Sequence, residues 1–263
     1  MSPSAYSEMA QVQDRHWWFV ARRKILHSEL VRLNLPADAS ILEVGSGTGA
    51  NLGLLSEFGH VTALEMSANA IALSRVRSDF DASRIVTQQK RCPDDLDSLT
   101  QQFDLICLFD VLEHIEDDEL SLSRLKTLLK PGGTLMLTVP AYSWMWGPHD
   151  IHLHHKRRYS KTRLLADCAR AGLSVQRASY FNTLLFPLAV VARLFERMTG
   201  KQSNAASRVP QRLVNAFLTS VFSFEGILLS RMTLPFGLSL LATTQTQPLN
   251  RPAPHPARET TPL

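Results

Sequence analysis

The chain of 263 residues is long enough for one large domain or for a domain with an extension. With 44% hydrophobic and 20% charged residues, it has the composition of a globular protein with a real core, which excludes a disordered chain. The net charge is a modest +4, and the three cysteines, Cys92, Cys107 and Cys168, lack CxxC spacing. We therefore expect reduced thiols in a cytosolic protein and no disulfide framework.

Residues 1–36 are predicted to form an N-terminal helical cap. Their opening, MSPSAYSEMAQVQDRHWWF, contains no apolar core of the kind that marks a secretion signal. The aromatic cluster of Trp17, Trp18 and Phe19 leaves two interpretations open. The three rings either pack against an edge of the sheet or form a flap that closes a ligand pocket.

Seven short β-like runs follow, and helical patterns separate the first five. This alternation predicts right-handed βαβ units and a doubly wound, mostly parallel sheet, which is a Rossmann-like α/β fold over residues 37–247. Several runs are apolar nearly throughout, as expected for strands buried on both faces. The runs are Ser40–Gly45, His60–Glu65, Arg84–Gln88, Phe103–Phe109, Thr134–Pro140, Leu173–Phe181 and Gly237–Thr244.

The first run leads directly into the glycine-rich sequence EVGSGTG, residues 43–49, and then into a helix. Gly45, Gly47 and Gly49 allow a tight turn and a close approach of the backbone to a ligand. The second run ends at Glu65, about 20 residues further on, where a carboxylate can accept both hydroxyls of a ribose. This frame predicts a ribose-bearing cofactor at the carboxyl edge of the sheet.

The residues around the glycines indicate which cofactor is expected. A dinucleotide fingerprint usually reads GxGxxG. Here Glu43 precedes the first glycine, where it would repel a diphosphate and suit a cationic amino-acid moiety. Together with FDLICLFDVLEHI and LKPGGTLMLTVP, this motif resembles the class I S-adenosylmethionine-dependent methyltransferases of the small-molecule, ubiquinone-methyltransferase-like type. The resemblance covers roughly Ser40 to Thr244 and implies S-adenosylmethionine as the cofactor.

The resemblance also implies roles for individual residues. Many family members carry an acid after the third strand, whereas this chain reads TQQKRCPDDL, so Gln88 or Gln89 would meet the adenine. If the leader is a flap, Arg22 or Arg23 would lie near the methionine carboxylate. The implied cofactor contacts are Glu43, Gly45, Ser46, Gly47 and Gly49 for the methionine part, Glu65 for the ribose, Met66 beside the adenine, and Asp110 and Val111 on the active-site side.

Three residues are candidates for catalysis. Methyl transfer needs alignment of the reactants, exclusion of water and, for a hydroxyl acceptor, a base. His114, in DVLEHI after the fourth run, is either that base or a histidine that holds the loop. Asp150 and His155, in HDIHLHHKRR after the fifth run, are the other candidates at the same edge.

The histidine-rich segment 149–158 allows three interpretations. A zinc site needs three or four converging ligands, and the cationic neighbours of this segment disfavour a dication, so no metal is expected. Otherwise the histidines are solvated, or they form an active-site wall for a polar or anionic acceptor, which arginine can grip with two hydrogen bonds. The expected acceptor contacts are His149, Arg157, Arg158 and Tyr159.

Residues 182–235, between the sixth and seventh runs, are predicted to form a helical, apolar and basic insertion. Six cations and two acids give it a net charge of +4, which equals that of the whole chain. It is either a small helical subdomain or a lid that rests at a membrane interface. Leu213–Leu229 is borderline in length and apolarity and is not expected to cross a bilayer. The Pro-rich residues 248–263 are expected to be a disordered tail.

The predicted function is methyl transfer from S-adenosylmethionine to a small, hydrophobic or lipid-linked acceptor, with O-methylation favoured. The enzyme is expected in the cytoplasm, with possible peripheral contact to the membrane. Two alternatives stay open, namely a methyltransferase that acts on RNA or protein and a non-catalytic membrane-associated adaptor that retains the fold. No nucleic-acid partner is expected, because the charge outside the insertion is zero and no added RNA module is visible.

Overall fold

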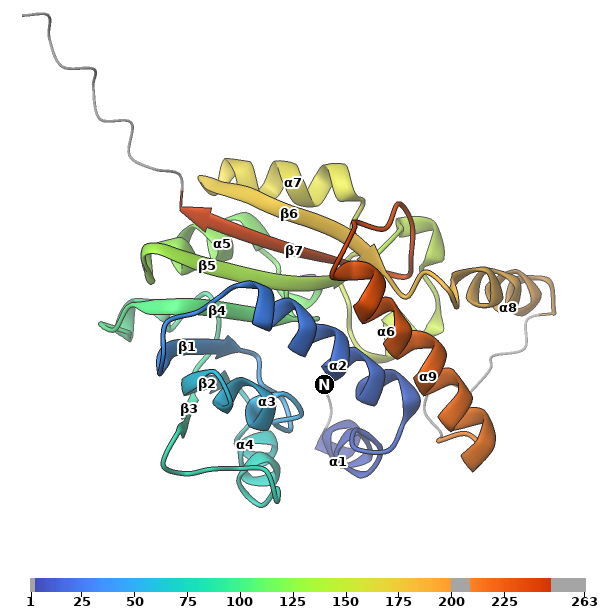
Figure 1. Cartoon of the computed structure of the whole chain (residues 1–263), viewed down its shortest axis with the longest axis horizontal. Helices are drawn as coiled ribbons and strands as arrows, with labels where there is room; N and C mark the ends of the chain where they lie inside the picture. Colours follow the sequence, from blue (N-terminus) through green and yellow to red (C-terminus); the bar gives the residue numbers. More distant parts are fainter. Residues whose placement is uncertain (1–2, 200–208, 247–263) are drawn as a thin grey trace, which may run out of the picture.

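A seven-stranded sheet lies between two layers of helices in the computed structural model, which describes residues 3–199 and 209–246 (Figure 1). All seven predicted runs form strands, so the predicted α/β fold is confirmed. The expected tail, 248–263, lies outside the described residues. The strands are β1 (Ala39–Val44), β2 (Gly59–Glu65), β3 (Ile85–Gln89), β4 (Phe103–Phe109), β5 (Leu129–Pro140), β6 (Leu173–Phe181) and β7 (Ser239–Thr246).

Helices connect the strands and also form the cap and the insertion. Side-chain oxygens of Ser67, Asp117 and Ser160 accept backbone N–H groups at the first turns of α4, α5 and α7, which explains where these helices begin. The helices are α1 (Pro3–Val12), α2 (Trp17–Arg32), α3 (Leu52–Ser56), α4 (Ala68–Arg75), α5 (Asp118–Thr127), α6 (Pro148–His152), α7 (Lys161–Arg170), α8 (Phe186–Thr199) and α9 (Arg212–Leu229), with 3-10 turns η1 (Leu96–Ser98), η2 (Leu112–His114) and η3 (Ser143–Met145).

The strand order is β3-β2-β1-β4-β5-β7-β6, and β7 runs antiparallel to both of its neighbours. The other four pairings within β1 to β5 are parallel. The chain winds outward in opposite directions from β1 and β4, so the crossovers leave a crevice at the carboxyl ends of these two strands. This topology places the loops after β1 and β4 side by side.

Two hydrophobic cores cover the two faces of the sheet. On β4, Ile106 and Leu108 belong to one core, and Leu105 and Cys107 belong to the other, because successive side chains of a strand point to opposite faces. The first core packs beneath α5 and α7, and the second packs beneath α2, α3 and α9. The central strands are therefore buried on both sides, as their continuous apolar sequences predict.

The cap and the insertion pack against each other on one face of the sheet, although they lie far apart in the sequence (Figure 1). The ring of Trp17 meets Phe222 of α9 edge-on, with centroids 5.9 Å apart, and Phe222 stacks on Phe181 of β6 at 6.2 Å. The backbone N–H of Trp17 donates to Asn215 Oδ1 at 2.9 Å. The partner of Trp17 is thus an insertion helix, which neither interpretation of the leader anticipates.

Among the described residues, α9 is the one helix whose length and composition would allow it to span a membrane. Its inner face is buried at Phe222, Glu225, Gly226 and Leu229. The Glu225 carboxylate accepts the backbone N–H of Leu184 at 2.7 Å, and burial raises its pKa. Because this face is bound to α2 and β6, only the opposite face of α9 is open to a further partner.

Candidate active site

The glycine loop after β1 leaves an open approach at Gly47. Gly45, Gly47 and Gly49 all adopt positive φ values, which L side chains rarely take. A Cβ at Gly45 would lie 2.7 Å from the side chain of Val111, so the loops after β1 and β4 are in direct contact. A Cβ at Gly47 would meet nothing within 4 Å. The backbone at Gly47 therefore faces free space, where a ligand can approach closely.

Glu65, at the end of β2, is fixed beside this loop. Its Oε2 accepts the N–H of Gly47 at 2.9 Å, and its Oε1 accepts the N–H of Ser67 at 2.9 Å and the hydroxyl of Tyr6 at 3.2 Å. The neighbouring Met66 is exposed, and its carbonyl accepts a hydrogen bond from the Gln89 side chain. The carboxylate predicted to hold a ribose thus points to the glycine loop, and a ribose would compete with Tyr6 for Oε1.

Two residues of the cap cover the glycine loop, and the sequence motifs do not reveal either of them. Tyr6 reaches Glu65 from α1, and Gln13 exchanges two hydrogen bonds with Thr48, one of them at 2.6 Å. Both cap side chains are buried. The segment that closes over the expected cofactor site is therefore the one that contains α1 and the turn after it.

Glu43 is a buried carboxyl with one unsatisfied oxygen. Its Oε1 accepts a hydrogen bond from Asn51 at 2.9 Å, whereas Oε2 has no hydrogen-bond partner within 3–199 and 209–246. Burial raises the pKa of Glu43 to about 7, against the opposing effect of the Asn51 hydrogen bond. Ser46, in the same loop, also has a buried hydroxyl without a partner in the described part of the chain. A small cationic group at this loop would satisfy the free oxygen of Glu43.

Arg22 joins the cap to the carboxyl end of β4, beside the glycine loop. It pairs with Asp110 at 2.6 Å and donates to Thr138 Oγ1 at 2.9 Å, and its guanidinium lies over the ring of Trp18. Asp110 itself has a φ of +57°, a left-handed conformation that aspartate tolerates better than most residues. Arg23 instead donates to the carbonyl of Gln13. Of the two arginines proposed for the flap, only Arg22 reaches the crevice.

Asp150 and His155 form a hydrogen-bonded pair at the same edge. Asp150 Oδ1 lies 2.9 Å from His155 Nδ1 and accepts Arg158 Nε at 2.8 Å, while Oδ2 accepts the N–H of Gly147 at 2.9 Å. Burial alone would raise the pKa of Asp150, but the hydrogen bonds from His155 and Arg158 hold it well below its usual range. An ionised Asp150 requires a proton on His155 Nδ1, which leaves Nε2 as a proton acceptor.

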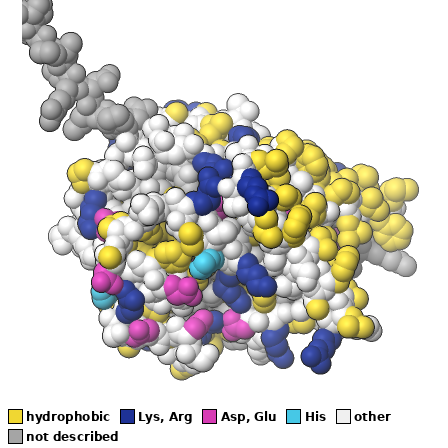
Figure 2. All heavy atoms as spheres, in the orientation of Figure 1, with side chains coloured by type: hydrophobic (Ala, Val, Ile, Leu, Met, Phe, Trp, Pro, Cys, Tyr) yellow, Lys and Arg dark blue, Asp and Glu magenta, His cyan; other side chains and the backbone are white. Residues whose placement is uncertain are grey.

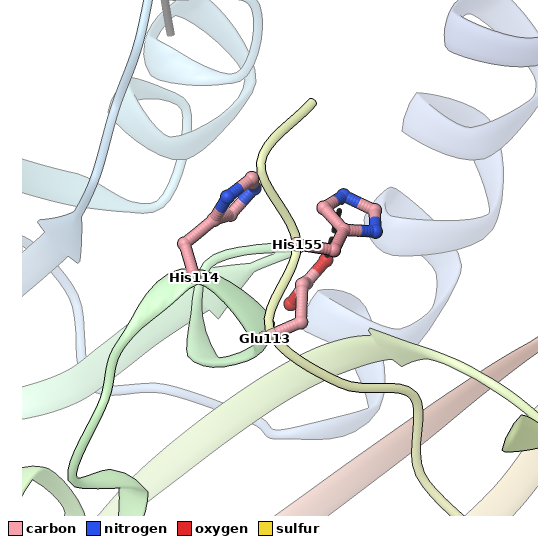
Figure 3. Close-up of side chains that lie close together, drawn as sticks. All are labelled: Glu113, His114 and His155. Carbon is pink, nitrogen blue, oxygen red and sulfur yellow. Dashed lines mark ion pairs between the residues drawn. The ribbon is translucent and has the colours of Figure 1, made fainter. Parts of the chain in front are cut away.

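The other ring nitrogen of His155 faces Glu113 and His114, which come from the loop after β4 (Figure 3). His155 Nε2 lies 4.0 Å from Glu113 Oε1, and the His114 and His155 rings meet edge-on with centroids 4.7 Å apart. Burial raises the pKa of Glu113 well above its usual value, and burial together with His155 lowers the pKa of His114 to about 4. Burial therefore favours the uncharged form of both neighbours of His155.

The same three side chains, Glu113, His114 and His155, could hold a metal ion, because their ligand atoms lie within 4.8 Å of one another. The sequence predicts no metal here, because its positively charged neighbours disfavour a dication. In the structure Arg157 pairs with Asp118 and Arg158 pairs with Asp150, so that repulsion is largely cancelled. The geometry thus removes the main argument against a cation at this position.

The structure contradicts one of the expected acceptor contacts and places two others in ion pairs. Tyr159 is completely buried in the core and donates its hydroxyl to Asp118 at 2.9 Å, so it cannot contact an acceptor. The guanidinium of Arg158 is buried between Asp150 and the carbonyl of Ala141, and that of Arg157 bonds to Asp118. His149 alone of the four is exposed, with its ring 6.4 Å from that of His155.

Because Arg158 neutralises a buried carboxylate, we expect Arg158→Ala to lower the free energy of unfolding by about 3–5 kcal/mol. The loss arises because Asp150 would remain charged and buried with fewer partners. Urea unfolding followed by circular dichroism measures the change. Arg163→Ala is the matched control, since its ion pairs are half exposed and worth at most about 1 kcal/mol. If the Arg158→Ala protein were stable but used its acceptor poorly, the result would instead support the predicted contact between Arg158 and the acceptor.

An aromatic cluster that no sequence motif indicates lies around Tyr142, in the loop that follows β5. Tyr142 stacks on Tyr180 with centroids 5.3 Å apart, and Trp144 and Phe186 pack around it at 5.6 and 5.5 Å. Tyr142 has a φ of +61°, which is strained for a bulky residue and typical of functional sites. The cluster provides an apolar wall at the carboxyl end of β5.

Comparisons with known proteins identify a methyltransferase domain. A family model described as a methyltransferase domain matches residues 18–185. A ubiquinone biosynthesis O-methyltransferase of Xanthomonas axonopodis pv. citri is 27% identical over 143 residues, which are 51% of this chain and 60% of that protein. The chain therefore spans less than two thirds of this relative.

Solved structures show the same fold at lower sequence identity. The glycopeptide N-methyltransferase MtfA, complexed with S-adenosyl-L-methionine, matches with a TM-score of 0.52 and 14% identity over 85% of this chain and 94% of that one. The cyclase SpnF matches with a TM-score of 0.54 and 19% identity over 86% and 81%. Since these folds serve different reactions, the chemistry has to be argued from the site.

Proposed function

The chain belongs to the methyltransferase-domain family, and from this premise we propose that it transfers a methyl group from S-adenosylmethionine to a hydroxyl of a small hydrophobic acceptor. The observation that carries the proposal is the pair of Asp150 and His155 at the same sheet edge as the glycine loop. A carboxylate-oriented imidazole is the arrangement that a hydroxyl acceptor requires, because its oxygen must lose a proton.

The residues at the glycine loop fit this cofactor. Gly47 leaves free space in front of the backbone, and the unsatisfied Oε2 of Glu43 can receive a cationic amino group. Glu65 can receive ribose hydroxyls in place of the Tyr6 hydroxyl. When bound, S-adenosylmethionine supplies a methyl group that is activated by the positive charge on its sulfur.

We propose that His155 takes the proton of the acceptor hydroxyl on Nε2 while Asp150 stabilises the resulting imidazolium. His114 beside Nε2, whose pKa burial lowers to about 4, would not repel the new charge. The His155 side chain is only 7% exposed, so water has little access to the base. A positioned base of this kind contributes about 10²–10⁴ in rate.

The proposed acceptor is hydrophobic because Tyr142, Trp144 and Phe186 form an apolar wall in the loop after β5, the segment that leads to Asp150 and His155. Aromatic rings bury large apolar areas and stack on planar ligands. The similarity to ubiquinone biosynthesis O-methyltransferases supports a hydroxyl on such a molecule. RNA fits less well, because the net charge of the chain outside the insertion is zero and no added RNA module is visible.

Cofactor affinity is expected to depend on pH through Glu43. With a pKa of about 7 in the free protein, the carboxyl is protonated at lower pH and must release a proton before it binds a cation. The Kd for S-adenosylmethionine should therefore rise by up to about tenfold per pH unit below 7 and level off above it. Calorimetry between pH 5.5 and 7.5, in two buffers of different ionisation enthalpy, measures both Kd and proton release. Glu43→Gln should bind S-adenosylmethionine weakly, and its Kd should not change with pH in this way. A wild-type Kd that does not depend on pH would argue against a contact between Glu43 and the cofactor.

The proposed function is tested by methyl transfer from labelled S-adenosylmethionine to lipid-soluble extracts, RNA and protein. We expect label in a lipid-soluble small molecule, and mass spectrometry should locate it on oxygen. Label in RNA or protein would contradict the acceptor class. Cofactor binding without transfer to any fraction would support a non-catalytic protein instead. Deletion of the insertion is unsuitable as a control, because α9 packs on α2.

A further inference from the structure

Helix α8 exposes apolar side chains along its whole length. None of its residues is buried. Leu188, Val191, Phe195 and Met198, which share one side at helical spacing, are between 63% and 86% exposed. Such a helix is unusual on a soluble surface, because burial of an apolar face normally provides most of a helix's stability in a protein.

Helix α9 continues this apolar surface on its outer side. Leu213, Phe217, Phe224 and Ile227 lie opposite the stripe that packs on α2, and each is at least 50% exposed. Figure 2 shows hydrophobic side chains gathered over the side of the molecule where α8 and α9 lie. These eight residues are named the α8–α9 face below. Contiguous apolar surface of this kind marks an interaction site.

The charges around the α8–α9 face are predominantly positive. Arg197, Arg212 and Arg231 are exposed on or beside the two helices. The acids of the described insertion are Glu196, which pairs with Arg193, and Glu225, which is completely buried. An apolar surface with a cationic rim complements anionic lipid headgroups above an acyl layer. Two copies of the same face would bring cation against cation, which disfavours self-association.

We propose that the α8–α9 face docks on the surface of a bilayer that contains anionic lipids. The two helices then lie in the interface, and the inner side of α9 stays bound to α2 and β6 as the buried Glu225 requires. Phe195 and Phe217 insert below the headgroups, while the arginines contact phosphates.

Docking at this face places the bilayer next to the candidate active site. Arg197 of α8 donates to the backbone carbonyl of Trp144, and the guanidinium of Arg193 fills the space in front of Gly147, where a Cβ would clash. Both contacts are with the loop that holds Asp150. Helix α8, which supplies half of the α8–α9 face, is therefore joined to the aromatic wall at Trp144, and a membrane-resident acceptor would enter there. This last step rests on the proposed function, whereas the docking itself does not.

Vesicle flotation of the purified full-length chain tests the docking. We expect wild type to float with vesicles of phosphatidylcholine and phosphatidylglycerol, and to do so less at high salt and with phosphatidylcholine alone. The double variant Phe195→Asp/Phe217→Asp should lose at least tenfold in partition coefficient, because two rings that insert below the headgroups are replaced by charges. Arg212→Gln and Arg231→Gln should each cost about fivefold on anionic vesicles.

Val86→Asp is the matched control, since Val86 is 57% exposed on the edge strand β3, away from the α8–α9 face. It should float like wild type. Thermal unfolding and cofactor calorimetry without lipid check that the variants are folded, so that a failure of docking is separable from a failure of the proposed function. Wild type that remains in the aqueous fraction, or a double variant that floats equally well, would overturn the proposal. A wild-type dimer that the double variant converts to a monomer would assign the face to a second copy instead.

Discussion

Gly47→Val is expected to abolish binding of S-adenosylmethionine. The backbone at Gly47 has a φ of +55°, where a β-branched residue is strained, and its Cβ position faces the free space proposed for the ligand. A valine side chain would occupy that space and would disturb the N–H of residue 47 that donates to Glu65. Calorimetry should detect saturable heat with wild type and none with the variant at the same concentrations.

Gly132→Val separates the loss of the ligand site from the cost of backbone strain. Gly132 has a φ of +78°, and its Cβ would also meet nothing within 4 Å, but it lies near the beginning of β5, at the opposite edge of the sheet. We expect both variants to be destabilised by a similar amount, on the order of 1–2 kcal/mol, while only Gly47→Val fails to bind. Equal binding by wild type and Gly47→Val would refute the assignment of the loop.

The part of the site that follows from the sequence is built from local motifs. EVGSGTG and Glu65 belong to one strand–loop–helix–strand unit, so their spacing alone brings them together around the crevice. Tyr6 and Gln13 could not be predicted in the same way. They reach the glycine loop from a helix far away in the sequence, and only tertiary packing brings α1 over the loop.

Charge patterns in the sequence pointed to residues 149–158 as an acceptor wall but did not reveal the intramolecular partners of their charged side chains. Residues 149–158 do line the carboxyl edge, but the sequence does not show that Arg158 neutralises Asp150 or that Tyr159 bonds to Asp118. A buried carboxylate can stay ionised inside the protein only if it is paired, and nearby arginines provide that pairing. Cationic residues in a segment that also supplies or meets buried acids are therefore weaker predictors of substrate contact than isolated cations.

In the insertion, too, the sequence predicts the elements but not their packing partners. Its helices follow from the periodicity of apolar residues, and the fold of the core domain follows from the alternating strands. The periodicity does not say which side of α9 is covered. Only the structure shows that Phe222 packs on Trp17 and Phe181, so that Phe217 and its neighbours are left exposed.

His155→Ala is expected to lower kcat for methyl transfer by about 10²–10⁴ and to leave the Kd for S-adenosylmethionine unchanged. The imidazole is the proposed base, but Asp150 keeps its hydrogen bonds from Arg158 and Gly147, so the loop should retain its fold. Steady-state kinetics with the acceptor that the labelling experiment yields measure kcat, and calorimetry measures cofactor binding. Because truncation leaves a gap beside Asp150, added imidazole should restore part of the rate, which a purely structural role would not permit.

His152→Ala is the control, since His152 is exposed on α6 and its loss should change kcat little. Chelation decides between a base and a metal ligand at the same position. Treatment with EDTA should leave wild-type activity intact if His155 acts as the base, because Nε2 must be free to take the proton. If chelation abolished activity and a divalent cation restored it, the cluster of Glu113, His114 and His155 would be a metal site, and the proton would have to be taken by another group.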